Sequence, residues 1–172
     1  MGSLMKPDLK IKSIYDLNPE MLKNKGIKGL LFDIDNTLEE YATKIPGEKL
    51  IHFIKMLSDK GLKIGIVSNA KIHRAEAFTS GFPKKSYPEI FVAGKAGKPL
   101  KKGFVEITAK MGIKLNEAAM IGDQLFTDIL GANRAGCFSI LVDPINPNIE
   151  PGFVKFKRFF EKPFMWGILC HI

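Results

Sequence analysis

The sequence predicts an α/β fold, a doubly wound parallel sheet with helices on both of its faces. Short apolar runs recur along the 172 residues, and several are apolar throughout, as strands buried on both faces require. Amphipathic helical patterns lie between these runs, and two of them open with proline and end at glycine. Strand and helix in regular succession favour parallel pairing, because a parallel crossover needs a long connection.

The expected strands follow one another at 27–34, 62–69, 89–93, 118–123 and 137–143. The expected helices lie at 46–61, 99–112 and 124–136. The first of these helices places four apolar side chains on one face: Leu50, Phe53, Ile54 and Leu57. Because no repeat or linker divides the chain, we expect a single α/β core.

The two ends of the chain differ from this core, which we place at 27–145. Residues 1–26 are expected to form an N-terminal extension with a short helix, capped by Asn18 and with Pro19 at its first position. Residues 146–172 form a basic aromatic tail, for which two arrangements are open. The tail either packs its aromatic side chains on the sheet or lies on a membrane surface.

Composition favours anionic partners without choosing among them. The chain has 26 Lys and Arg against 18 Asp and Glu, a net charge of +8, which also fits an ordinary basic soluble protein. Its two cysteines allow no disulfide framework and no cysteine zinc site, so we expect a reducing, cytoplasmic setting. Neither a signal peptide nor a membrane-spanning apolar stretch is expected.

Polar side chains follow the predicted strands at the points where the strands end. Asp33 and Asp35 end the first strand, Asp123 ends the fourth, and the other groups are Ser68, Asn69 and Lys98. The carboxyl ends of parallel strands meet at one edge of a sheet, where ligands bind. Carboxylates, a hydroxyl and a lysine together suit Mg²⁺ and a phosphate group, and the cation would offset the charge of two adjacent aspartates.

Four motifs, "DIDNT", "VSN", "GKP" and "GDQLFTD", occur in this order at the expected strand ends. With them the chain resembles the haloacid dehalogenase (HAD) superfamily of phosphohydrolases over about residues 27–143. The resemblance implies that Asp33 is the nucleophile and forms an aspartyl-phosphate, and that Asp35 is the general acid and base. It also implies that Asp33, the Asp35 backbone carbonyl and Asp123 hold Mg²⁺.

The same resemblance implies a phosphate site. Thr37 and Ser68 would bind the phosphoryl oxygens with the backbone amides around Asn36 and Asn69, while Lys98 would balance the developing charge. Some residues keep a simpler interpretation: Ser68 as a turn residue and Lys98 as a solvated lysine. Asp128 either orients the site or caps the following helix, and Arg74 either binds a second anionic group or is a surface residue.

The spacing of the motifs leaves no room for a cap domain, either between Thr37 and Ser68 or between Ser68 and Lys98. An open site suits a large or membrane-bound substrate. Three longer segments, "IKGLLFDIDNTLEEY", "IVSNAKIHR" and "IGDQLFTDILGANRAG", resemble the YqeG-type branch of HAD subfamily IIIA. Relatives of that branch include phosphatidylglycerophosphate phosphatases, so the resemblance implies an anionic lipid headgroup as substrate.

Basic residues near the predicted site agree with such a substrate. A rim of lysines precedes and follows the "GKP" motif: Lys84, Lys85, Lys95, Lys98, Lys101 and Lys102. Lysines close to an anionic bilayer each contribute about 1 kcal/mol to binding, so peripheral contact with the inner face of the membrane is expected. The tail interleaves Lys and Arg with Phe, but no nucleic-acid-binding module matches it.

The sequence therefore predicts a Mg²⁺-dependent HAD phosphatase acting on phosphatidylglycerophosphate. The alternative substrates are a soluble sugar phosphate, a phosphoprotein or a nucleic acid end. An alternative of another class is a partner-binding module with vestigial phosphatase activity. The sequence gives no signal for an oligomeric state.

Overall fold

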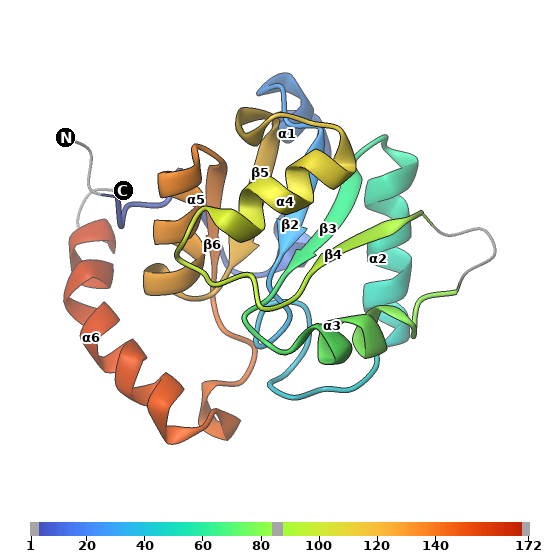
Figure 1. Ribbon diagram of the computed structural model, residues 1–172. Coiled ribbons are helices and arrows are strands. Elements are labelled where there is room, and N and C mark those ends of the chain that lie inside the picture. Colours follow the sequence, from blue (N-terminus) through green and yellow to red (C-terminus); the bar gives the residue numbers. More distant parts are fainter. Residues whose placement is uncertain (1–3, 84–87, 170–172) are drawn as a thin grey trace.

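The computed structural model describes residues 4–83 and 88–169 (Figure 1). In these ranges it has one sheet, whose strands pair in parallel in the order β1-β6-β5-β2-β3-β4. The strands are β1 (Leu9–Ile11), β2 (Gly29–Phe32), β3 (Lys63–Val67), β4 (Ile90–Ala93), β5 (Ala118–Gly122) and β6 (Phe138–Val142). The predicted doubly wound α/β fold without a cap domain is confirmed.

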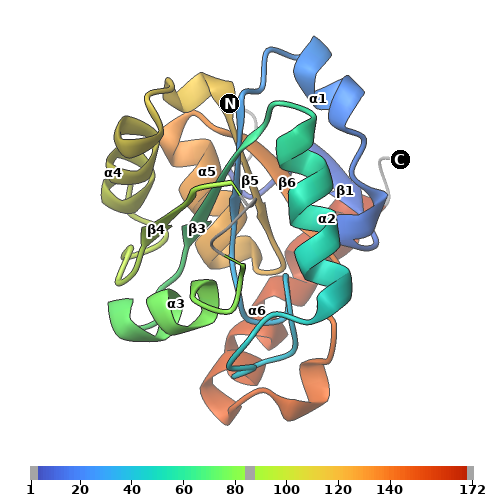
Figure 2. The same ribbon diagram turned by 90° about the vertical axis from the view of Figure 1, so that its right-hand side faces the viewer.

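Helices cover both faces of the sheet (Figures 1 and 2). They are α1 (Pro19–Asn24), α2 (Glu48–Asp59), α3 (Ile72–Thr79), α4 (Lys102–Met111), α5 (Leu130–Ala135) and α6 (Gly152–Leu169). In Figure 2, α1 and α2 lie on one side of the sheet and α4 and α5 on the other. A π-helical turn, η3 (Leu125–Ile129), joins β5 to α5, where the sequence predicted one continuous helix.

The central strand β2 is buried along its whole length because its side chains alternate between two cores. Leu30 and Phe32 belong to the core under α2, whereas Leu31 packs in the core under α4. Strands β3 and β5 flank β2, and Leu31 is in register with Gly65 on one side and with Met120 on the other. This pairing fixes the chain after Phe32 at the middle of the carboxyl edge of the sheet.

The N-terminal segment contains the short helix that the sequence predicted, and also an edge strand that it did not. Asn18 Oδ1 accepts the Met21 N–H at 3.1 Å, and Pro19 is the first residue of α1. Strand β1 pairs with β6, and Asp8 Oδ2 accepts hydrogen bonds from the N–H and the hydroxyl of Ser139. Residues 9–11 therefore belong to the sheet.

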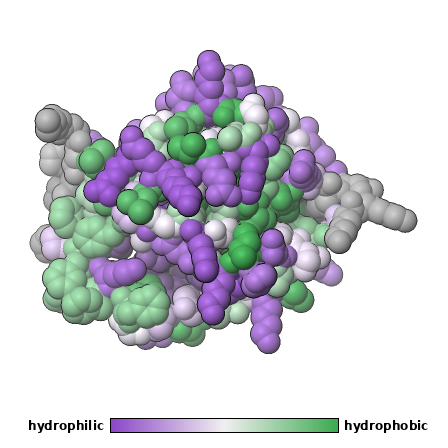
Figure 3. Space-filling view, viewed as in Figure 1, coloured by the Kyte–Doolittle hydropathy of each residue, from purple (hydrophilic) through white to green (hydrophobic). Residues whose placement is uncertain are grey.

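The tail folds into α6, which turns Val154, Arg158 and Glu161 toward the protein and most of its aromatic side chains toward solvent. Val154 and Glu161 are buried, at 6% and 4% exposed. The exposed large side chains are Phe153, Phe156, Phe159, Phe160 and Phe164. Figure 3 shows these apolar groups at the lower left, over α6. These five are largely exposed, although Phe164 meets the Phe126 ring of η3 edge to face, with centroids 5.8 Å apart. Both arrangements expected for the tail therefore stay open.

Two further expectations concern the lysine rim and membrane-spanning segments. Lys84 and Lys85 of the lysine rim lie outside the described residues. Within the described ranges, no helix is both long enough and apolar enough to cross a membrane.

Candidate active site

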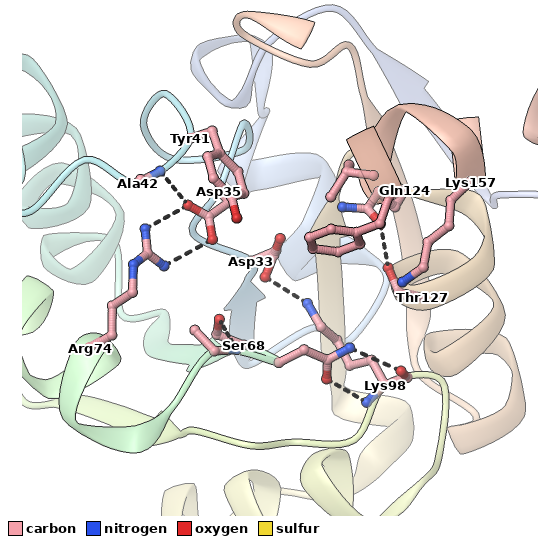
Figure 4. Close-up of a pocket in the computed structure, with 14 residues that line it drawn as sticks. Asp33, Asp35, Tyr41, Ala42, Ser68, Arg74, Lys98, Gln124, Thr127 and Lys157 are labelled. Atoms are coloured by element: carbon pink, nitrogen blue, oxygen red, sulfur yellow. Dashed lines mark hydrogen bonds and ion pairs between the residues drawn. The ribbon is translucent and has the colours of Figure 1, made fainter. Parts of the chain in front are cut away.

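A pocket of about 290 Å³ lies at the carboxyl edge of the sheet (Figure 4). The loops after β2, β3, β4 and β5 form its floor and sides, and α6 closes one wall. Six residues singled out from the sequence line it: Asp33, Asp35, Ser68, Asn69, Arg74 and Lys98. The topology thus brings these side chains together from the segments that follow β2, β3 and β4.

Lys98 is buried at the floor of the pocket and is not a solvated surface lysine. Its Nζ lies 2.7 Å from Asp33 Oδ1 and 2.7 Å from Asp128 Oδ1. Burial alone would lower the pKa of Lys98, but the charges of Asp128 and Asp33 outweigh it and raise the pKa above its ordinary value. Lys98 therefore remains a fixed positive charge beside Asp33.

The Asn69 side chain holds Lys98 in place through the backbone. Its Nδ2 donates to the Lys98 carbonyl at 3.0 Å, and its Oδ1 accepts the Lys98 N–H at 2.8 Å. The donor and the acceptor of the Asn69 amide thus both bind the backbone of Lys98. The Asn69 side chain therefore positions the lysine, and the backbone amide of Asn69 remains available for the phosphate contact that the resemblance implies.

Three buried carboxylates gather beside Lys98: Asp33, Asp123 and Asp128, each offering an oxygen within 4.8 Å of the others. Burial raises the pKa of Asp33 to about 7, although Lys98 opposes this and the other two aspartates add to it. Burial and the charge of Asp128 raise the pKa of Asp123 to about 6. Hard oxygen donors with this excess of negative charge fit a divalent cation.

Gly122 explains how Asp128 reaches this cluster. A Cβ on Gly122, the last residue of β5, would lie 2.4 Å from Asp128 Cγ, so only glycine leaves room for the aspartate. Asp128 also accepts the Gln124 N–H with Oδ2 at 3.1 Å, at the start of η3. Asp128 therefore lies in the acidic cluster and supports the turn after β5, whereas neither η3 nor α5 has a side-chain cap.

Asp123 is held from two sides. Thr37 donates its hydroxyl proton to Asp123 Oδ1 at 3.0 Å. On the other side Arg158 of α6 pairs with Asp123 Oδ2 and with Glu150. Sequence reasoning missed Arg158 and Glu150, and the one signal for either was the arginine within the basic tail.

Asn36 links the nucleophile loop to the same network. Its backbone is left-handed, with φ of 60°, a conformation that asparagine tolerates better than most residues. Its Nδ2 donates to Glu150 Oε1 at 2.5 Å, and its Oδ1 accepts the Asn146 N–H at 3.0 Å. The loop after β2 is therefore fixed to the segment that leads into α6.

Arg74 and Asp35 form an ion pair at the mouth of the pocket (Figure 4). Two guanidinium nitrogens donate to the two carboxylate oxygens, at 2.9 and 2.6 Å, and the Ala42 N–H donates to Oδ1 at 2.8 Å. Arg74 is thus neither a free surface residue nor an unpaired anion receptor. Its charge orients the Asp35 carboxylate.

Ser68 is buried at the end of β3, and its Oγ accepts the Ala70 N–H at 3.1 Å. This contact uses the hydroxyl oxygen as an acceptor and leaves its proton available to donate into the pocket. The turn role and the phosphate role proposed for Ser68 are therefore compatible.

Comparison with known proteins identifies relatives of the whole core. Residues 2–146 match the family model described as "Mitochondrial PGP phosphatase". A Bacillus subtilis protein described as "Probable phosphatase YqeG" is 36% identical over 91% of this chain and 87% of its own length. The chloroplastic/mitochondrial phosphatidylglycerophosphate phosphatase 1 of Arabidopsis thaliana is 30% identical over 90% of this chain, which spans 45% of that protein.

Solved structures share the fold at lower identity. An uncharacterized protein from Listeria monocytogenes aligns with a TM-score of 0.56 and 20% identity over 73% of this chain and 85% of its own. The cobalt-bound deoxy-D-mannose-octulosonate 8-phosphate phosphatase of Haemophilus influenzae aligns with a TM-score of 0.51 and 18% identity, over 78% of this chain and 77% of its own. These likenesses support the α/β core that the sheet order shows.

Proposed function

This chain belongs to the mitochondrial PGP phosphatase family and is a HAD-type phosphatase, and on that premise we propose that it removes the terminal phosphate of phosphatidylglycerophosphate. The observation that supports this most is the placement of Asp33. Its carboxylate follows the central strand, lines the pocket and lies 2.7 Å from the ammonium group of a buried lysine.

Asp33 is the nucleophile in this proposal. One of its oxygens attacks phosphorus, and the bond from phosphorus to the ester oxygen breaks. Asp35, protonated for this step and released from its ion pair with Arg74, gives its proton to that oxygen, which leaves as the free hydroxyl of phosphatidylglycerol. Water then attacks the aspartyl-phosphate and transfers a proton to Asp35, so that inorganic phosphate leaves and both aspartates return to their initial forms.

We propose Mg²⁺ as the cofactor. Asp33, Asp123 and the backbone carbonyl of Asp35 would hold it, with Asp128 in the same acidic cluster. The ion would supply positive charge against the transferred phosphoryl group. Thr37 and Arg158 keep Asp123 oriented toward this site.

The phosphoryl oxygens would be bound by donors at the pocket floor. Ser68 has a free hydroxyl proton, Lys98 supplies a fixed charge, and the backbone amide of Asn69 completes the set. The Asn36 N–H, which the resemblance also implied, already donates to the Glu39 carbonyl at 2.7 Å. Thr37 already donates to Asp123, so we assign it the orientation of that carboxylate rather than direct contact with phosphate.

We also propose that the enzyme works at an anionic membrane surface, to which it binds peripherally. The exposed phenylalanines of α6 are flanked by Lys155 and Lys157, whereas Glu161 on the same helix is buried. Aromatic side chains suit the interface of a bilayer, and lysines beside them suit anionic headgroups. Phe153 and Lys157 also line the pocket, so the same helix would bring the membrane to the active site.

The test is Mg²⁺-dependent phosphate release from phosphatidylglycerophosphate in mixed micelles. The parent should release phosphate, and Asp33→Asn should lower kcat by at least about 10³-fold because the nucleophile is lost. Asp59→Asn, a change of an exposed aspartate on α2, should leave kcat unchanged. Release from an aryl phosphate but not from the lipid would retain the mechanism and overturn the substrate.

A further inference from the structure

Three basic side chains line the pocket, and two of them are neutralised by carboxylates. Lys98 is paired with Asp33 and Asp128, and Arg74 is paired with both oxygens of Asp35. Lys157 has no carboxylate within ion-pairing distance among the residues that the structure describes. It is therefore the cation of the pocket that remains available to an anion from outside.

The position of Lys157 differs from that of an ordinary surface lysine. It lies on the pocket wall opposite Arg74, with Asp33 between them (Figure 4). Its Nζ is 5.7 Å from the centroid of the Phe153 ring, a contact that guides the flexible side chain along the wall.

The wall itself is anchored next to Lys157. Arg158, the following residue, pairs with Asp123 and with Glu150, and Glu161 Oε1 accepts the Phe126 N–H at 2.9 Å. These contacts fix α6 against the catalytic edge of the sheet, so the backbone that carries Lys157 has a defined place relative to Asp33.

We infer, on the basis of the proposed function, that Lys157 binds a second phosphate of the substrate while the first is transferred to Asp33. The site would then select molecules that carry a phosphodiester near the phosphomonoester, as the headgroup of phosphatidylglycerophosphate does. A substrate with a single phosphate leaves Lys157 unused. Lys157 is a specificity-determining residue in this inference, not a residue that acts on the reacting atoms.

The same phosphodiester chemistry has a second source, the headgroups of neighbouring lipids in the bilayer. A soluble substrate separates the two sources. Glycerophosphoglycerophosphate, the deacylated headgroup, keeps both phosphates without a membrane, and glycerol 3-phosphate has one phosphate. The quantity to measure is the ratio of kcat/KM for the first substrate to kcat/KM for the second, in the full chain with Mg²⁺.

Lys157→Met removes the charge and keeps the hydrocarbon stem, and we expect it to lower this ratio about tenfold, through a higher KM for the two-phosphate substrate. Lys157→Arg should restore most of the ratio because it restores the charge. Lys25→Met is the matched control: Lys25 is also exposed and lies over a phenylalanine ring, that of Phe138, but outside the pocket. It should leave the ratio unchanged.

Two contrary results have different meanings. If the parent prefers the two-phosphate substrate and Lys157→Met keeps that preference, the assignment of Lys157 is overturned while the proposed function stands. A loss seen with anionic vesicles but not with the soluble headgroup also overturns it, in favour of a membrane contact. If the parent shows no preference for two phosphates, the proposed substrate and the role of Lys157 both fail.

Discussion

At the scale of single residues, the position of Lys98 depends on hydrogen bonds from the Asn69 side chain. Lys98 makes two ion pairs with its side chain, and Asn69 makes two hydrogen bonds with its backbone. The charge beside the nucleophile is therefore placed by a neutral amide that touches neither carboxylate in the described structure.

We predict that Asn69→Ala lowers the free energy of unfolding by about 1 kcal/mol, because two partly buried backbone groups of Lys98 lose their partner. It should also lower kcat about tenfold or more, because Lys98 shifts relative to Asp33. Urea unfolding and steady-state kinetics measure the two effects. Asn69→Asp keeps the acceptor for the Lys98 N–H but places a carboxylate oxygen against the Lys98 carbonyl, so it should restore little of the stability. A loss of stability with unchanged kcat in Asn69→Ala would contradict the positioning role.

Glu161 gives a prediction for pH. Burial raises its pKa from the ordinary 4.5 to about 7, although the Phe126 N–H and Arg158 oppose the shift. Between these two values the unfolded chain loses the proton before the folded chain does, so the folded state loses stability as pH rises. The loss is complete above pH 7 and amounts to about 3 kcal/mol.

Glu161→Gln keeps an acceptor for the Phe126 N–H but cannot ionise. Its free energy of unfolding should therefore fall less than that of the parent between pH 4.5 and about 7. Urea titrations across this window measure the difference. Parallel pH profiles for parent and variant would show that Glu161 ionises in the folded protein as it does in the unfolded chain.

At the scale of elements, α6 differs from an ordinary surface helix, because it turns ionic groups toward the protein and aromatic groups toward solvent. Phe156 and Phe160 pack edge to face on its outer side, with ring centroids 4.9 Å apart, while Arg158 and Glu161 make the inner contacts. A helix that buries ionic groups and exposes aromatic ones presents an apolar patch to water, and such patches mark sites of contact with a protein or a membrane.

We predict that changing Phe156 and Phe160 to serine together lowers binding to anionic vesicles at least about tenfold, because each buried aromatic contributes on the order of 1.5–3 kcal/mol. Flotation on vesicles with and without anionic lipid measures it. The melting temperature should change little, since Phe156 is 64% and Phe160 49% exposed in the folded protein. Unchanged vesicle binding by a folded double variant would rule out this face as the membrane contact.

The elements also show what a sequence can predict. Strands β2, β3, β4, β5 and β6 were predictable because each is a mostly apolar run, and the shared strand edge then brought Asp33, Ser68 and Lys98 together. Strand β1 was not, because three residues around Lys10 become a strand only by pairing with β6. Likewise, the pairing of Arg158 with Asp123 depends on how the tail folds back, which no local pattern encodes.

At the scale of the whole molecule, the acidic cluster joins two parts of the sheet edge. Asp33 follows β2, and Asp123 and Asp128 follow β5, the strand beside it. Their mutual repulsion would be relieved by a divalent cation, which would bind the folded protein and not the unfolded chain.

We predict that Mg²⁺ raises the melting temperature, and that a concentration of about 100 times its dissociation constant stabilises the fold by about 2.7 kcal/mol. Differential scanning fluorimetry over a Mg²⁺ titration measures this shift. Asp123→Asn should reduce it, whereas Asp59→Asn should not. No shift in the parent at saturating Mg²⁺ would contradict metal binding at this cluster.

The pairing of β1 with β6 has a consequence for synthesis of the chain. Leu9 is in register with Ile140, so β1 pairs with a strand that leaves the ribosome long after it. Strands β2 and β3 can associate early, but the β1 edge stays unpaired until β6 has emerged, and contacts so distant in sequence slow folding. A nascent chain that stalls before residue 138 would therefore expose two open strand edges to chaperones and to other chains.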